Sequence, residues 1–123
     1  MGLVDDYKFA QMIKALAHQI GNLIEYREVG QNCELSYLAV KRYLNFLAKT
    51  FICILIKPYF NNKRTEIVKN PKIYFSDTGL RNYVVDDFRD LDSREDAGAL
   101  LENAFVMQLL KSEMSFNFWR SKQ

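Results

Sequence analysis

The sequence has 123 residues, of which 49% are hydrophobic and 26% are charged, and its formal net charge is +2. These values are typical of a globular protein with one domain, or with one small domain and part of a second, and they exclude a disordered chain. The first residues lack a signal-peptide pattern, and no apolar run approaches the roughly 20 residues of a membrane span. We therefore expect a cytoplasmic protein without membrane contact. Cys33 and Cys53 have neither a disulfide-framework nor a metal-ligand spacing, so we expect reduced thiols.

The charges are unevenly distributed along the chain. Between residues 36 and 73, Glu66 is the single acid among eight lysines and arginines. Between residues 77 and 102, eight acids stand against three arginines. A basic half followed by an acidic segment indicates two units with different surroundings.

The first predicted element is an amphipathic helix that Asp5 or Asp6 caps and that ends near Gly21. Its apolar residues recur at helical spacing and form one stripe; they are Phe9, Met12, Ile13, Leu16, Ala17 and Ile20. A short extended piece follows at residues 23–26. Residues 27–31 predict a second, short helix.

The third predicted helix spans residues 37–49, with Ser36 as its N-cap. One face is apolar and predicts burial; it consists of Val40, Tyr43, Leu44 and Leu47. The opposite face carries cations and an amide. Leu38 and Phe46 also fall toward that outer side, so the polar face is not uniform.

Residues 51–56 are rich in isoleucine and aromatic side chains and predict a strand. Pro58 stops regular pairing, and Asn61–Arg64 is a turn signal that carries two charges. Residues 65–68 are expected to be extended, and residues 72–75 predict a second strand. The order helix, short helix, helix, strand, basic turn, strand is that of a winged helix-turn-helix, in which the basic turn is the wing.

The pattern changes after Asp77, and either Asp77 or Thr78 is expected to cap a short helix through Val84. Residues 86–96 form an acidic loop, and residues 99–113 predict a helix that is apolar on every side. Residues 116–119 predict a strand for which no neighbouring strand is visible. We therefore expect a second domain that is cut, and self-association as a two-fold dimer through the exposed apolar helix of residues 98–113.

Five stretches of the chain resemble one protein family. They are Leu16–Asn22, Ser36–Leu44, Lys72–Asn82, Gly98–Asn103 and Phe118–Arg120, of which the block Tyr74-Phe-x-Asp-x-Gly-Leu-Arg-Asn82 is the most specific. They resemble the C-terminal half of archaeal and bacterial AAA-type ATPases, a domain of unknown function that follows the nucleotide-binding module. The resemblance implies a winged helix followed by a restriction-endonuclease-like part of the PD-(D/E)XK type.

The resemblance also implies what this chain lacks. It would begin after the ATPase domain and end inside the nuclease-like domain, before the acidic strand with which the family usually continues. The sequence has no Gly-x-x-x-x-Gly-Lys-Ser/Thr pattern, so we expect no ATP binding, no cofactor and no catalysis by this chain itself. The missing ATPase domain becomes a candidate partner.

The expected fold class is mainly α with a small β-hairpin (α+β). Residues 1–76 would form the winged helix-turn-helix, residues 77–97 an acidic linker with a short helix, and residues 98–123 the start of the truncated nuclease-like domain. The strongest functional candidate is DNA contact through the third helix and the wing. The side chains concerned are cationic or form hydrogen bonds; they are Tyr37, Lys41, Arg42, Asn45, Lys49, Lys63 and Arg64.

Two alternatives stay open for the whole chain. The basic face could be a solvated surface of a protein-interaction or dimerisation module that couples the ATPase to the end domain, which Leu38 and Phe46 favour. The chain could also be the remnant of a metal-dependent nuclease, to which Glu102 would contribute one ligand. A single acid without partners more often interacts with its own helix dipole.

Two other polar positions are expected to be structural. His18 is expected at the surface. Asp77 is expected to cap a helix and to form an ion pair with Arg81, four residues further along.

Overall fold

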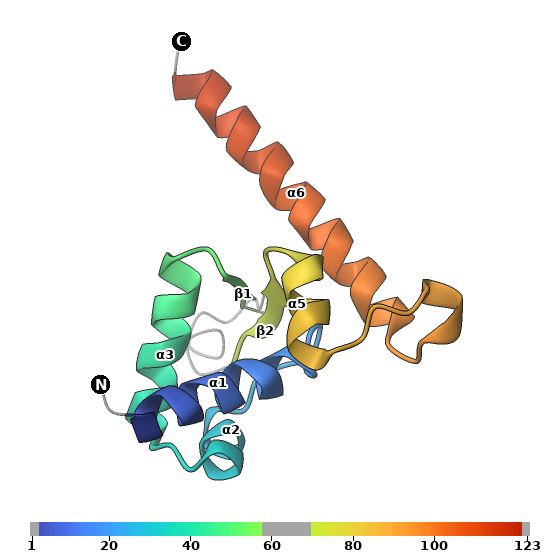
Figure 1. The fold of residues 1–123 in the computed structure, drawn as a ribbon. Coiled ribbons are helices and arrows are strands. Elements are labelled where there is room, and N and C mark those ends of the chain that lie inside the picture. The colour runs from blue at the N-terminus through green and yellow to red at the C-terminus, as the bar shows by residue number, and fades with distance from the viewer. Residues whose placement is uncertain (1–2, 58–69, 122–123) are drawn as a thin grey trace.

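The computed structural model describes residues 3–57 and 70–121, with side chains described for residues 6–57 and 70–113. Three helices come first: α1 (Leu3–Ala17), α2 (Tyr26–Cys33) and α3 (Tyr37–Lys49). Strands β1 (Cys53–Ile56) and β2 (Lys72–Phe75) follow, and then α5 (Thr78–Val85), a 3-10 turn (Leu91–Ser93) and α6 (Ala97–Ser121) (Figure 1). The chain is mainly helical with one small antiparallel hairpin, as predicted. The element order agrees with a winged helix-turn-helix.

Local capping explains the bounds of the short helices. Ser36 Oγ accepts a hydrogen bond from the Ala39 amide at 3.1 Å, which fixes the start of α3 at the predicted residue; the helix also ends at the predicted residue, Lys49. Glu25 caps α2 by accepting from the Arg27 amide at 2.9 Å, which makes α2 longer than predicted. Gly30 is required in α2 because an added Cβ would lie 2.6 Å from the Leu35 carbonyl oxygen. The predicted cap of α1 at Asp5 or Asp6 is wrong, because α1 begins at Leu3.

The hairpin pairs Cys53 with Phe75 and Ile56 with Lys72. A third extended segment joins the free edge of β2, where Leu23 forms an antiparallel bridge with Lys72. The Gly21 amide donates to the Ile73 carbonyl at 2.8 Å, and Gly21 has a positive φ of 83°, which favours glycine there. The extended piece expected at residues 23–26 is thus confirmed at its first residue.

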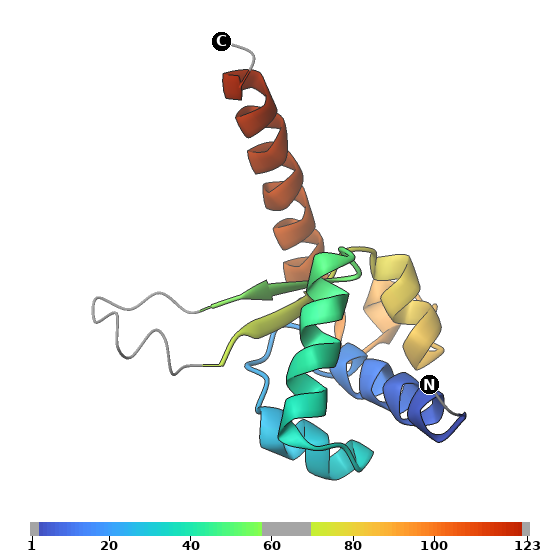
Figure 2. The same cartoon turned by 90° about the vertical axis from the view of Figure 1, so that its left-hand side faces the viewer.

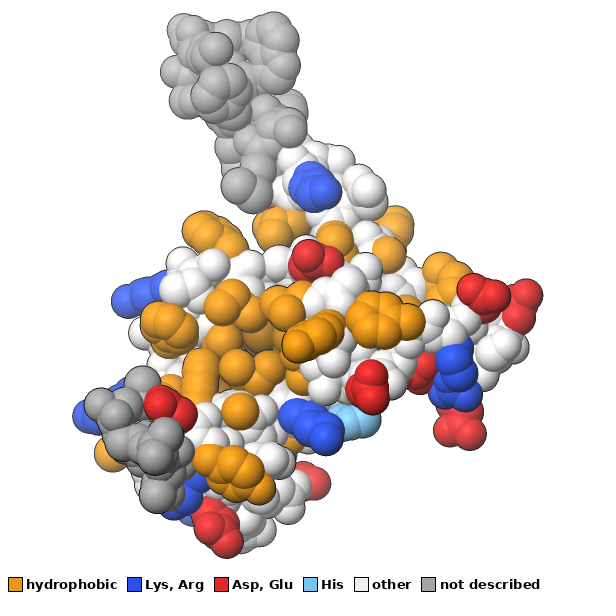
Figure 3. All heavy atoms as spheres, in the orientation of Figure 1, with side chains coloured by type: hydrophobic (Ala, Val, Ile, Leu, Met, Phe, Trp, Pro, Cys, Tyr) orange, Lys and Arg blue, Asp and Glu red, His pale blue; other side chains and the backbone are white. Residues whose placement is uncertain are grey.

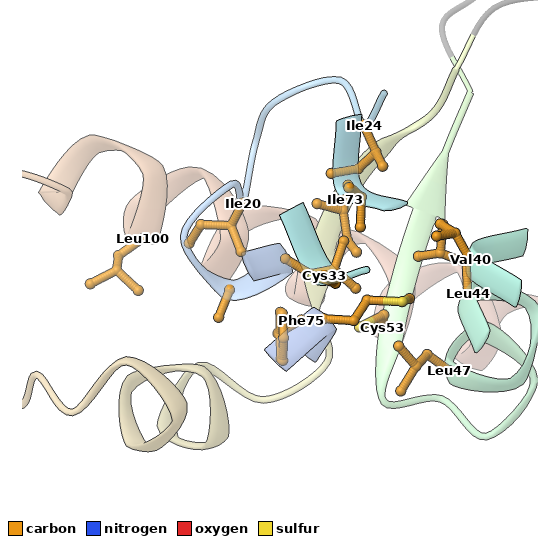
Figure 4. Packing of buried hydrophobic residues seen from close by; sticks show 14 residues of the cluster. Ile20, Ile24, Cys33, Val40, Leu44, Leu47, Cys53, Ile73, Phe75 and Leu100 are labelled. Atoms are coloured by element: carbon orange, nitrogen blue, oxygen red, sulfur yellow. The ribbon is translucent and has the colours of Figure 1, made fainter. Parts of the chain in front are cut away.

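The core lies where α1, α2, α3 and the hairpin meet (Figure 4). Its largest fully buried apolar side chains are Phe75, Met12, Leu16, Ile24, Leu44, Leu47, Ile73, Val29 and Val40. Cys33 and Cys53 are buried free thiols in the same cluster, and burial raises the pKa of Cys53 to about 12. Both cysteines therefore act as small apolar core residues.

Helix α5 is fixed to α1 by a buried arginine. The Arg81 side chain donates through Nε to the Ala17 carbonyl at 2.7 Å and forms an ion pair with Asp96. Arg94 is also buried and pairs with the same carboxylate at 2.6 Å, which holds the acidic loop against α5. The expected ion pair between Asp77 and Arg81 is wrong, because Arg81 points to the end of α1 and Asp77 only caps α5.

Helix α6 differs from the sequence prediction at its end. The strand expected at residues 116–119 is wrong, because these residues continue one helix, Ala97–Ser121. Among the described residues, no further strand is placed to pair with them. A helix satisfies its backbone hydrogen bonds within itself, so it needs no such neighbour. After its first turns α6 runs away from the rest of the chain (Figure 2).

Candidate nucleic-acid interface

The outer side of α3 carries most of the described residues that were expected to contact DNA. Lys41, Arg42, Asn45 and Lys49 are all exposed, whereas Val40, Leu44 and Leu47 are buried on the opposite face, as the helical pattern predicted. Ser36 fixes the start of the helix, and the buried leucines fix its rotation. The basic side chains therefore have a defined direction on the surface.

Three of these residues line one groove beside β1. Lys41, Arg42 and Asn45 border a hollow of about 400 Å³, together with Leu55 of β1 and Tyr26 of α2; Leu38, Leu44 and Ala48 complete its wall. We call this hollow the α3–β1 groove. Lys49 is exposed one turn further along α3 and is not among the lining residues. The expected wing residues Lys63 and Arg64 lie outside the described residues.

Tyr37, the first residue of α3, is exposed and lies next to Lys41, but it is not among the residues that line the groove. The Arg27 guanidinium carbon lies 5.3 Å and the Lys41 ammonium nitrogen 5.4 Å from the centre of its ring, both in cation–π range. The Tyr26 ring lies 5.9 Å away at a tilted angle. Burial, and to a lesser extent Tyr37, raises the pKa of Tyr26. Two cations and two tyrosines thus form one cluster.

Arg27 and Tyr26 were not predicted as site residues. Both belong to the start of α2, and the packing of α2 against α3 brings them to Tyr37. The signal available in the sequence was weak: an arginine in the first turn of the helix that precedes the third helix in a helix-turn-helix. The sequence-based prediction used the third helix and the wing and missed the contribution of α2.

The two apolar residues on the outer side of α3 separate in space. Leu38 lines the α3–β1 groove, whereas Phe46 turns toward α1 and lies 6.2 Å, ring to ring, from Phe9. A second groove of about 530 Å³ runs there between α1 and α3; its lining residues are Asp6, Phe9, Ala10, Ile13, Tyr43 and Phe46. Figure 3 shows a broad apolar area on the face of the molecule where α3, α1 and α5 meet. The outer side of α3 thus has a basic edge and an apolar edge.

Glu102, the candidate metal ligand, is engaged within the chain. Its Oε1 accepts a hydrogen bond from the Tyr74 hydroxyl at 2.6 Å and lies 3.8 Å from the Lys72 ammonium. Burial and this hydrogen bond raise the pKa of Tyr74 to about 12. Among the residues that the structure describes, no group of three or more histidines, cysteines or acids could hold a metal ion. His18 is exposed on the turn after α1.

Asn103 is a second residue that the sequence did not single out. It is fully buried; its Nδ2 donates to the Phe75 carbonyl at 2.8 Å, and its Oδ1 accepts from the Phe75 amide at 2.9 Å. One side chain thus satisfies both backbone groups of Phe75, in the manner of a neighbouring strand. Asn103 and Glu102 attach the start of α6 to β2.

These elements define a class of protein: a small helical domain in which the third helix and the hairpin border a basic groove. Residues 2–92 match the family described as "Domain of unknown function (DUF8612)", and the chain belongs to this family. It is similar to the uncharacterized protein Mb2031c of Mycobacterium bovis and the uncharacterized protein Rv2008c of Mycobacterium tuberculosis, each 30% identical over 113 residues. The matches cover 88% of this chain and 25% of each relative, so the chain spans about a quarter of the length of these relatives. No solved structure was found to match.

None of the helices in the described part of the chain has the length and apolarity that a bilayer crossing requires.

Proposed function

We propose that the chain is a nucleic-acid-binding winged-helix module of an AAA-type ATPase, that it acts in the cytoplasm, and that it binds without catalysing a reaction. The observation that carries the proposal is the α3–β1 groove, in which Lys41, Arg42 and Asn45 lie together beside the hairpin. The ATPase context rests on the family resemblance of the sequence. The mycobacterial relatives extend far beyond the matched region, which leaves room for such a domain.

The groove has the chemistry that a duplex requires. Lysine and arginine displace counterions that are condensed on the phosphates, and an α-helix fits the major groove. Arg42 can bind a guanine edge and Asn45 an adenine edge, whereas Lys41 and Lys49 are suited to phosphates. The Tyr37 hydroxyl can donate to a phosphate at the start of α3.

Fluorescence anisotropy with a labelled duplex tests the proposal. We expect weak binding that falls steeply between about 50 and about 200 mM salt. Lys41→Ala should weaken binding and reduce the salt dependence by about one unit of the log–log slope, whereas Arg42→Ala should weaken binding and relax the preference for a guanine. Lys14→Ala is the matched control, because Lys14 is an exposed cation on α1, away from the groove. No binding at tens of micromolar in low salt, or an equal loss in the control, would overturn the proposal.

A protein-interaction module that couples the ATPase to the end domain is the second candidate. The apolar groove between α1 and α3 favours it, because aromatic side chains that line an open hollow are typical of protein contacts; here Phe46 is exposed and Phe9 and Tyr43 are half-buried. This candidate requires that Phe46→Glu impair the function of the full-length protein while Lys41→Ala leaves it intact. The third candidate, a nuclease remnant, has no observation in its favour, since Glu102 is bound by Tyr74.

A further inference from the structure

Helix α6 carries an apolar stripe that the described chain leaves more than half exposed, although its two ends border hollows beside the acidic loop and β1. Leu101, Phe105 and Leu109 are 59%, 63% and 53% exposed, and their four-residue spacing places them on one face of the helix. The opposite face is occupied, because Leu100 and Asn103 are buried against the body of the molecule. Met107 and Leu110 line a hollow beside Phe51 and Ile54. We call Leu101, Phe105 and Leu109 the α6 stripe.

We propose that the α6 stripe binds the same stripe of a second copy of this chain, with the two helices antiparallel and Phe105 on the two-fold axis. In this register Leu101 faces Leu109 of the second copy, and Gly98 faces its Ser112. Each contact thus occurs twice, as a two-fold interface requires, with the leucines next to the central Phe105 pair and the small residues beyond them. Gly98 is exposed, and a Cβ added there would meet nothing within 4 Å, so packing within the chain does not require glycine at this position.

Charge complementarity favours the antiparallel arrangement. Residues 86–96, which lead into α6, carry six carboxylates and two arginines. Asp90 of this loop lines a hollow with Leu101 and Ala104, so the acidic loop lies beside that edge of α6. Lys111 follows Ala104 by seven residues, or about two turns, and lies on the same edge.

The antiparallel register places Lys111 level with residue 99 of the second copy, next to its acidic loop. A parallel pair would instead place Lys111 beside Lys111 of the second copy. Opposite charges at the rim therefore select one orientation, while the apolar stripe provides the contact area.

The exposed area of the stripe determines how strongly the two copies are expected to bind. Three side chains that are each more than half exposed offer roughly 300 Å² per copy, below the about 800 Å² per partner of a standard interface. We therefore expect a dimer that dissociates in the micromolar range. Association should be visible at high protein concentration and should be lost on dilution.

Sedimentation velocity over about 1 to 100 µM protein tests the dimer. We expect the sedimentation coefficient to rise with concentration for the unmodified chain and to stay at the monomer value for Phe105→Glu. Tyr83→Glu is the matched control, since Tyr83 is 73% exposed on α5, and it should associate as the unmodified chain does. A monomer at about 100 µM, or an equal effect of both substitutions, overturns the proposal.

Two further experiments test the register and do not depend on DNA binding. Lys111→Glu should weaken association, and combining it with Asp90→Lys should restore it. Chains with Leu101→Cys, mixed with chains with Leu109→Cys, should form a disulfide between unlike chains under mild oxidation. Failure of the charge reversal to restore association, or cross-links only between like Leu101→Cys chains, overturns the antiparallel register.

Discussion

Helices α3 and α6 both carry exposed apolar residues, but their positions in the fold are determined in different ways. In α3 a regular apolar face, Val40, Leu44 and Leu47, packs into the core and fixes which side chains face outward. In α6 apolar residues occur on all sides, so the pattern alone does not select a buried face. The buried amide of Asn103 selects it instead, by binding Phe75. Hydrophobic periodicity orients α3, and a specific hydrogen-bonding residue orients α6.

The largest effect should come from the buried face of α3. Leu44→Ala removes a fully packed side chain from the core and should lower the free energy of unfolding by about 2–5 kcal/mol. Leu38→Ala on the exposed side of the same helix should change it by less than about 0.5 kcal/mol. Urea unfolding followed by circular dichroism measures both. Equal losses would show that the helical pattern does not determine which face of α3 is buried.

Asn103→Leu tests the hydrogen-bonded attachment of α6. The substitution leaves the Phe75 amide and carbonyl without their partner, and each unsatisfied buried group costs about 1–3 kcal/mol. We expect a loss of that order in urea unfolding, and faster hydrogen exchange at the Phe75 amide. Asn45→Leu, the same change at an exposed site of α3, is the control. An unchanged exchange rate at Phe75 would contradict the assigned role of Asn103.

The contrast between the two helices also explains what could be predicted from the sequence. Ser36, the two faces of α3 and the β-branched strands are local signals, which predict α3 and β2 to the residue and place the other elements up to β2 within a few residues. Asn103, Glu102 and the Arg81–Asp96 pair act between residues that are far apart in the sequence, where no local pattern indicates the partner. Arg27 was likewise not predicted as a site residue, because the packing of α2 on α3 brings it to Tyr37 and no local pattern indicates that contact.

The Tyr74–Glu102 hydrogen bond gives the attachment of α6 a pH dependence. Burial, and then the hydrogen bond to Glu102, raises the pKa of Tyr74 from its ordinary value of 10.0 to about 12. The folded state therefore holds the phenolic proton more tightly than the unfolded chain does. This contribution is complete below about pH 10 and is lost as the pH rises through about 12.

Tyr74→Phe should remove this loss of folding stability at alkaline pH. Urea unfolding at about pH 9 and about pH 11 should show a smaller decrease in stability for the variant than for the unmodified chain. Tyr83→Phe, which changes an exposed tyrosine, should behave like the unmodified chain. A parallel decrease in all three proteins would mean that Tyr74 is not the group responsible.

The smallest effect is expected at the edge of the basic groove, where Arg27 lies over the Tyr37 ring. If α2 contributes to the proposed DNA contact, Arg27→Ala should weaken duplex binding about two- to threefold and should reduce the log–log salt slope by about one, the amount expected for one phosphate contact. Arg27→Lys should keep the salt slope, because the charge remains. The α6 dimer should be unaffected by either change, since Arg27 lies on the α3 side of the molecule. A loss of affinity in Arg27→Ala without any change in the salt slope would show that Arg27 only supports the position of Tyr37 and does not itself meet a phosphate.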